Sequence, residues 1–90
     1  MKISVGWGGE TEVLAHRVSG DSTQEFYLLD KYQTGGLAFP LNYDHQVWEQ
    51  KPTDIESKLR GTFDNLEDAQ LFLEALCPSG TIYDRTRQTS

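Results

Sequence analysis

Residues 53–77 read TDIESKLRGTFDNLEDAQLFLEALC, and two hydrophobic periodicities follow one another within this stretch. Along residues 54–63 apolar or small side chains alternate strictly with polar ones, which is typical of a half-buried β-strand. From residue 66 onward the spacing is that of an α-helix. One face of that helix collects five apolar residues: Leu66, Ala69, Phe72, Leu73 and Leu76. The stretch therefore predicts a strand that leads directly into a helix.

Both ends of the helix are marked in the sequence. The tetrapeptide DNLE at residues 64–67 fits a capping box that starts at Asp64. Pro78 disfavours helical geometry at the residue before it, and Gly80 follows two residues later. We therefore expect the helix to occupy about residues 65–77.

The start of the strand has an alternative interpretation. The tetrapeptide TDIE at residues 53–56 also fits a capping box, so residues 53–59 open either as a strand or as a short helix. The strand is favoured because the polar positions alternate strictly, whereas a helix would group them in threes and fours. In that strand, Leu59 and Phe63 point inward and meet the helix in the core.

The rest of the chain predicts further strands separated by turns. Residues 37–43 alternate around Pro40, which cannot donate to a sheet ladder, so this segment is an edge strand or an extended loop. The fold class is α+β, an antiparallel β-meander of four to six strands packed on one α-helix. We expect a single small domain over residues 1–84 and a frayed tail at residues 85–90. The other strands are expected at residues 2–7, at residues 10–18 after a hairpin turn at Gly8-Gly9, and at residues 24–30, with residues 46–49 and 81–84 as candidates for further short strands.

Composition limits the classes of function. A domain of 90 residues has a modest core with little room for a large cofactor. Its formal net charge is −6, from 14 acidic and 8 basic residues. This balance argues against direct binding of nucleic acid or an anionic membrane. The excess of acid either suits a basic protein partner or serves only to keep a small domain soluble. A single cysteine and the lack of a signal core or a membrane-length apolar run indicate the cytoplasm.

Few residues carry the potential for catalysis. Cys77 follows the helix C-terminus, where the helix dipole disfavours a thiolate, so we interpret it as a structural thiol. His16 and His45 lack the spacing of metal ligands and are interpreted as strand-surface and turn residues. Glu10 and Glu12 share a strand face without an apolar pocket that would separate their roles. We expect no catalytic residue, no metal and no cofactor, and an enzyme is the least favoured hypothesis.

Two groups of residues are candidates for binding a partner. The first lies on the outer face of the predicted helix, where Leu71 is surrounded by acids: Asp64, Glu67, Asp68 and Glu74. Residues 64–77 contain these four acids and no base, which is −4 of the total charge of −6. The second is a set of aromatic residues that so small a domain cannot easily bury: Tyr32, Phe39, Tyr43 and Trp48. Core packing is the competing expectation for Phe39 and Trp48.

In size, acidity and lack of catalytic motifs the chain resembles small phage-encoded antagonists of host defence enzymes, including anti-CRISPR proteins. The resemblance is one of profile and carries no site residue over. It implies a non-enzymatic inhibitor or modulator of a basic, nucleic-acid-handling protein. Two alternatives stay open. The helix acids imitate the charge of a nucleic acid, or the protein is a structural or accessory subunit that forms a homodimer through the edge strand at residues 37–43.

Overall fold

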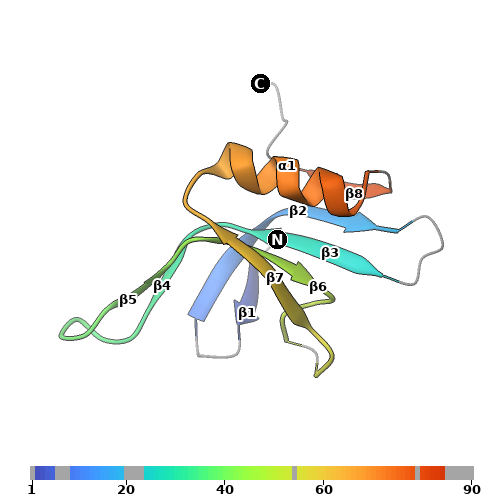
Figure 1. Ribbon diagram of the computed structural model, residues 1–90. Helices are drawn as coiled ribbons and strands as arrows, with labels where there is room; N and C mark the ends of the chain where they lie inside the picture. Colours follow the sequence, from blue (N-terminus) through green and yellow to red (C-terminus); the bar gives the residue numbers. More distant parts are fainter. Residues whose placement is uncertain (1, 6–8, 20–23, 54, 79, 85–90) are drawn as a thin grey trace.

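The computed structural model describes residues 2–5, 9–19, 24–53, 55–78 and 80–84, and it shows an antiparallel sheet packed against one helix (Figure 1). The α+β class is thereby confirmed. Trp7 and the predicted tail at residues 85–90 lie outside the described residues. The elements in chain order are β1 (Lys2–Val5), β2 (Gly9–Val18), β3 (Glu25–Leu29), β4 (Tyr32–Thr34), β5 (Leu41–Tyr43), β6 (His45–Glu49), β7 (Lys58–Phe63), α1 (Leu66–Leu76) and β8 (Thr81–Asp84).

The main sheet has the strand order β1-β2-β3-β6-β7, with β8 paired to β2. The length of β2, 10 residues, allows two strands to share its outer edge. β1 pairs with residues 9–12 and β8 with residues 15–17, both antiparallel. The first strand, β1, and the last strand, β8, therefore both pair with β2.

A second, two-stranded sheet extends the hairpin between β3 and β6. β4 follows β3 closely and pairs antiparallel with β5, which leads at once into β6. This pair projects away from the body of the molecule (Figure 1). We call residues 32–43 the arm, and residues 35–40, which connect its two strands, the tip. The arm therefore extends beyond the part of the sheet that α1 covers (Figure 1).

Apolar side chains cover both faces of the main sheet. On one face, Ala69 and Leu73 of α1 pack onto sheet residues that include Leu28 and Val47, as predicted for the helix. The opposite face carries a second cluster, which consists of Ile3, Val5, Val13, Tyr27, Leu29 and Tyr32, with Tyr43 and Trp48 packed against it.

An irregularity in β2 serves both clusters. The register with β3 shifts between Val13 and Ala15, which strict alternation would place on the same face. Val13 is fully buried in the second cluster, and Ala15 is 1% exposed in the cluster beneath α1. The one strand therefore contributes core residues to both sides of the sheet.

The strand before the helix is shorter than predicted. β7 begins at Lys58, and residues 52–53 and 55–56 form turns, so neither the strand nor the short helix expected there is present. Asp54 lies outside the described residues. Ile55, which the predicted alternation places on the same face as Leu59 and Phe63, is 103% exposed. Ser57 donates a hydrogen bond to the Pro52 carbonyl across the turn, at 3.3 Å.

A bulge in β7 changes the face on which Leu59 lies. Val47 of β6 pairs with Gly61, whereas Trp48 pairs with Leu59, which leaves Arg60 as an extra residue. Leu59 therefore lies with Trp48 on the face opposite the helix and is 47% exposed. The prediction that it meets the helix is wrong.

The prediction for Phe63 is confirmed. Its ring packs against that of Phe72, with the two centroids 5.0 Å apart. Phe63 lies beyond the bulge, toward the helix, where the alternation of β7 is again regular.

Candidate partner-binding surfaces

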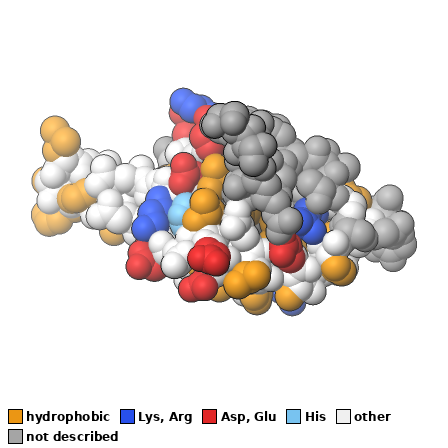
Figure 2. Space-filling model, turned by 90° about the horizontal axis from the view of Figure 1, so that it is seen from above, with side chains coloured by type: hydrophobic (Ala, Val, Ile, Leu, Met, Phe, Trp, Pro, Cys, Tyr) orange, Lys and Arg blue, Asp and Glu red, His pale blue; other side chains and the backbone are white. Residues whose placement is uncertain are grey.

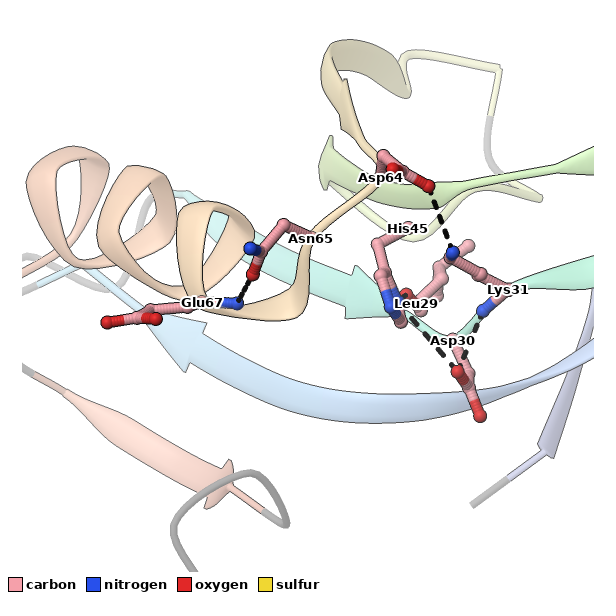
Figure 3. A network of polar contacts seen from close by, with 7 residues as sticks. All are labelled: Leu29, Asp30, Lys31, His45, Asp64, Asn65 and Glu67. Carbon is pink, nitrogen blue, oxygen red and sulfur yellow. Dashed lines mark hydrogen bonds and ion pairs between the residues drawn. The ribbon is translucent and has the colours of Figure 1, made fainter.

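The first turn of α1 begins one residue later than the capping pattern suggested. Asn65 is the N-cap, and its Oδ1 accepts the backbone N–H of Glu67 at 2.7 Å (Figure 3). Glu67 and Asp68 are exposed in this turn, where carboxylates interact favourably with the helix dipole. Leu71, one turn further, is 59% exposed. Acids and an exposed leucine thus lie together on the outer face of the helix.

Two of the four acids have cationic neighbours from other elements. Asp64 Oδ1 accepts a hydrogen bond from Lys31 Nζ at 3.1 Å (Figure 3). Glu74 Oε1 lies 3.7 Å from Nη2 of Arg17 in β2. The charge of −4 counted over residues 64–77 does not include Lys31 and Arg17, which lie elsewhere in the sequence. The charge open to a partner is therefore concentrated on Glu67 and Asp68.

Arg17 is a buried residue whose role the sequence reasoning missed. It is 5% exposed and reaches from β2 to the end of α1, where its Nη1 donates to the Cys77 carbonyl at 2.7 Å. The last turn of α1 has no basic residue of its own, so Arg17 both satisfies a terminal carbonyl and neutralises the negative end of the dipole. The sequence did contain a sign of this burial. Arg17 lies two residues after Ala15 in β2, so the alternation of a strand places both side chains on the same inward face.

Cys77 and His45 both lie in the interior. Cys77 is 3% exposed in the cluster beneath α1, in keeping with a structural thiol. His45 is 7% exposed at the start of β6, which corrects its interpretation as a turn residue. Its Nδ1 lies 3.1 Å from the Leu29 carbonyl oxygen and 3.8 Å from Asp30 Oδ1 (Figure 3). These contacts fasten the root of the arm to the sheet.

The arm root and the helix N-terminus lie at the same end of the molecule. Lys31, which connects β3 to β4, donates its backbone N–H to Asp30 Oδ1 at 2.8 Å and its Nζ to Asp64, just before α1 (Figure 3). One residue thus links the base of the arm to the start of the acidic helix.

The tip of the arm exposes large apolar side chains. Leu37 is 105% exposed, Phe39 is 83% exposed, and Leu41, at the start of β5, is 54% exposed. Figure 2 shows hydrophobic side chains gathered at the free end of the arm. The predicted edge strand at residues 37–43 is regular only over Leu41–Tyr43, and Phe39 does not pack in the core.

The other predicted aromatic residues form the wall of a hollow rather than an exposed patch. Tyr32 is 9% exposed, and its ring stacks on that of Tyr43 with the centroids 4.7 Å apart. The hollow has a volume of about 330 Å³ and opens on the face of the sheet opposite α1. The described residues that line it are Val5, Tyr32, Tyr43, Gln46, Trp48, Pro52 and Leu59.

Gln46 organises the polar groups of this hollow. Its Oε1 accepts hydrogen bonds from the Tyr32 hydroxyl at 3.1 Å and from Trp48 Nε1 at 3.0 Å. Burial, together with the neighbouring Tyr43, raises the pKa of the Tyr32 hydroxyl above its ordinary value. Tyr32 therefore remains a neutral donor throughout the physiological pH range.

The described residues contain no group of three His, Cys, Asp or Glu side chains placed to hold a metal ion. Over the same part of the chain, no helix combines the length and the apolar character needed to span a membrane. Comparison of the chain with protein-family models, curated proteins and solved structures yields no match. The function is therefore inferred from the residues of this chain alone.

Proposed function

We propose that this protein is a non-enzymatic binding module for other protein chains. The observation that carries the proposal is that large apolar side chains are exposed at two places: on the outer face of α1, where Leu71 is 59% exposed, and at the arm tip, where Leu37 and Phe39 are 105% and 83% exposed. Burial of such a side chain is favourable by about 1.5–3 kcal/mol relative to full exposure. Contiguous apolar groups at the end of a projecting arm are typical of a surface that contacts another protein.

The outer face of α1 supports a basic protein as the partner. Glu67 and Asp68 are exposed, and no ion pair within the described residues involves either of them. Leu71 provides an apolar anchor beside these charges, an arrangement common at interfaces. Complementary charge would steer a basic partner to this face and fix its orientation.

The mode of action that we propose is inhibition. A basic surface that handles nucleic acid is blocked when an acidic domain occupies it, and the small size and net charge of −6 suit that role. The profile shared with phage-encoded antagonists of host defence supports the same assignment. We propose the cytoplasm as the location, which the free thiol of Cys77 supports.

A pair of charge-reversal variants tests this function. Glu67→Lys/Asp68→Lys and the control Glu10→Lys/Glu56→Lys both change the net charge from −6 to −2, because each acid-to-base exchange adds two charges. Glu10 and Glu56 are exposed and lie away from the helix. The partner is first identified by affinity purification from the producing cells with the full chain. We expect the helix variant to bind the purified partner at least about tenfold more weakly at low salt, and the control to bind nearly as tightly as the wild type.

Three results would contradict the proposal. The helix face is not the site if Glu67→Lys/Asp68→Lys binds as tightly as the wild type. If both charge-reversal variants lose the same affinity for the partner, then binding depends on the net charge of the protein and not on the helix face. An acidic partner would refute the charge argument outright.

A further inference from the structure

The arm is amphipathic along its length. Leu41 and the stacked rings of Tyr32 and Tyr43 lie on one face, as the register of β4 and β5 requires. The opposite face is polar, with Gln33 Nε2 donating to Asn42 Oδ1 at 2.9 Å. An apolar stripe therefore runs from the exposed tip along one face of the arm to its root.

The hollow lies at the inner end of that stripe. Tyr32 and Tyr43 belong both to the root of the arm and to the lining of the hollow. Its volume of about 330 Å³ is in the range of sites that hold small apolar groups. Leu59 lines it while keeping 47% of its surface exposed, so the hollow is accessible from outside.

Gln46 is the polar residue whose side-chain amide lies in the lining of the hollow. Because an indole N–H only donates, the Gln46 atom 3.0 Å from Trp48 Nε1 is the carbonyl oxygen. The amide nitrogen lies at the other side of the Gln46 side-chain terminus and has no partner among the described residues.

We propose that the occupant of the hollow is the arm tip of a second copy of this chain, so that two copies form a two-fold symmetric dimer with antiparallel arms. A two-fold interface uses the same patch on both subunits, and here one patch contains an apolar projection and an apolar recess. From the Tyr32–Tyr43 pair the arm extends through two further residues of each strand, about 7 Å at roughly 3.3 Å each, and then through the tip. Two antiparallel arms overlapping over that length place each tip at the root of the other arm.

The dimer would bury the exposed tip and fill the hollow of each copy, and it would leave the outer face of α1 exposed. Both tips and both hollows are occupied in a closed pair, so no open chain of copies forms. The acidic face of α1 lies on the other side of the sheet from the hollow and stays open to a basic partner. The proposal deepens the proposed function because it identifies what the arm contacts. It differs from pairing through an edge strand, because side chains and not ladder hydrogen bonds make the contact.

Sedimentation equilibrium of the full chain tests the dimer. Leu37→Ser/Phe39→Ser removes the tip, Leu59→Lys places a charge in the hollow, and Leu71→Ser is the control, an exposed leucine on α1. We expect the dimer dissociation constant to rise at least about a hundredfold in the tip and hollow variants and to stay unchanged in the control. All four positions are at least 47% exposed, and circular dichroism verifies that each variant is folded.

An equimolar mixture of the tip and hollow variants provides a test of the contact itself. Each mixed dimer retains one intact tip and one intact hollow facing each other. We expect it to associate at least about tenfold more tightly than either variant alone. A wild type that is monomeric up to about 1 mM, a dimer insensitive to the tip variant, or a mixture no tighter than its components would each overturn the proposal.

The two proposals fail separately in these measurements. Glu67→Lys/Asp68→Lys is expected to bind the basic partner weakly and still form the dimer. Leu37→Ser/Phe39→Ser is expected to lose the dimer and still contact the basic partner through α1.

Discussion

Arg17 shows how one residue can complete an element to which it does not belong. It donates to the Cys77 carbonyl and lies beside Glu74, with a side chain only 7% exposed. Arg60 provides a comparison, because it also pairs with a glutamate, Glu49, at 2.6 Å, but from a side chain 39% exposed. The two arginines differ mainly in their burial and in the helix carbonyl that only Arg17 satisfies.

We predict that Arg17→Met lowers the free energy of unfolding by about 1.5–3 kcal/mol, because it leaves a terminal carbonyl and a partly buried carboxylate without their cation. Arg60→Met should cost less than about 1 kcal/mol, since exposed ion pairs contribute little. Urea denaturation at neutral pH measures both. Equal losses in the two variants would show that Arg17 does not support the end of α1.

Part of the candidate site on α1 could be predicted from the sequence. The helical periodicity correctly placed Leu71, Glu67 and Asp68 on an exposed face, because the face of a helix depends on local spacing. It did not show that Asp64 and Glu74 have cationic neighbours. Lys31 and Arg17 are far from them in sequence and approach only through the sheet.

At the scale of elements, α1 is the best determined part of the chain. Its bounds, Leu66–Leu76, match the predicted apolar face, but the cap is Asn65 rather than Asp64. Both residues have side chains able to cap a helix, so local preference did not discriminate between them. The path of β7 does, because it leaves Asp64 directed toward Lys31 (Figure 3).

We predict that Asn65→Ala lowers the free energy of unfolding by about 0.5–2 kcal/mol, because the Glu67 N–H loses its acceptor. Asp64→Ala should cost less than about 0.5 kcal/mol, because its ion pair with Lys31 is between side chains 89% and 49% exposed. Asn65→Asp, which keeps a capping oxygen, serves as the control. Thermal and urea unfolding measure all three, and the reverse ranking of Asn65→Ala and Asp64→Ala would contradict the cap assignment.

β7 shows why strands are harder to predict than the helix. Its polar alternation was real, yet Leu59 lies on the face opposite the helix because the bulge at Arg60 interrupts the pairing with β6. A bulge depends on the register between two strands, and the strand's own sequence carries little information about it. The same holds for β2, where a register shift sends Val13 and Ala15 to opposite clusters.

At the scale of the whole molecule, the main sheet contains the hydrophobic core, and the arm projects from it. Both apolar clusters draw on the main sheet, and of the arm only its root, Tyr32 and Tyr43, packs into one of them. Every residue of the tip, 35–40, is exposed. The tip therefore makes no contribution to the core, which leaves it open for the contact with a second copy proposed above.

We predict that replacing residues 35–40 by Asn-Gly, a favoured two-residue hairpin turn, leaves the body folded. The free energy of unfolding in dilute solution should change by less than about 1 kcal/mol, because no buried side chain is removed. The wild type should show a Tm that rises with protein concentration, and the trimmed chain should not, since a dimer stabilises its folded subunits by mass action. Differential scanning calorimetry over a range of concentrations measures both, and an unfolded trimmed chain would show that the tip belongs to the fold.

The sequence by itself determined the helix, most strand positions and the α+β class, because periodicity, caps and turn residues act over a few neighbours. It also determined the excess of acid and the exposed leucine of α1. Only the tertiary structure decided that Arg17 closes the helix, that Leu59 faces away from it, and that Tyr32 and Trp48 line a hollow while Phe39 is exposed. These outcomes depend on strand register and on which apolar surfaces find a cover, and both are set by contacts between residues distant in the chain.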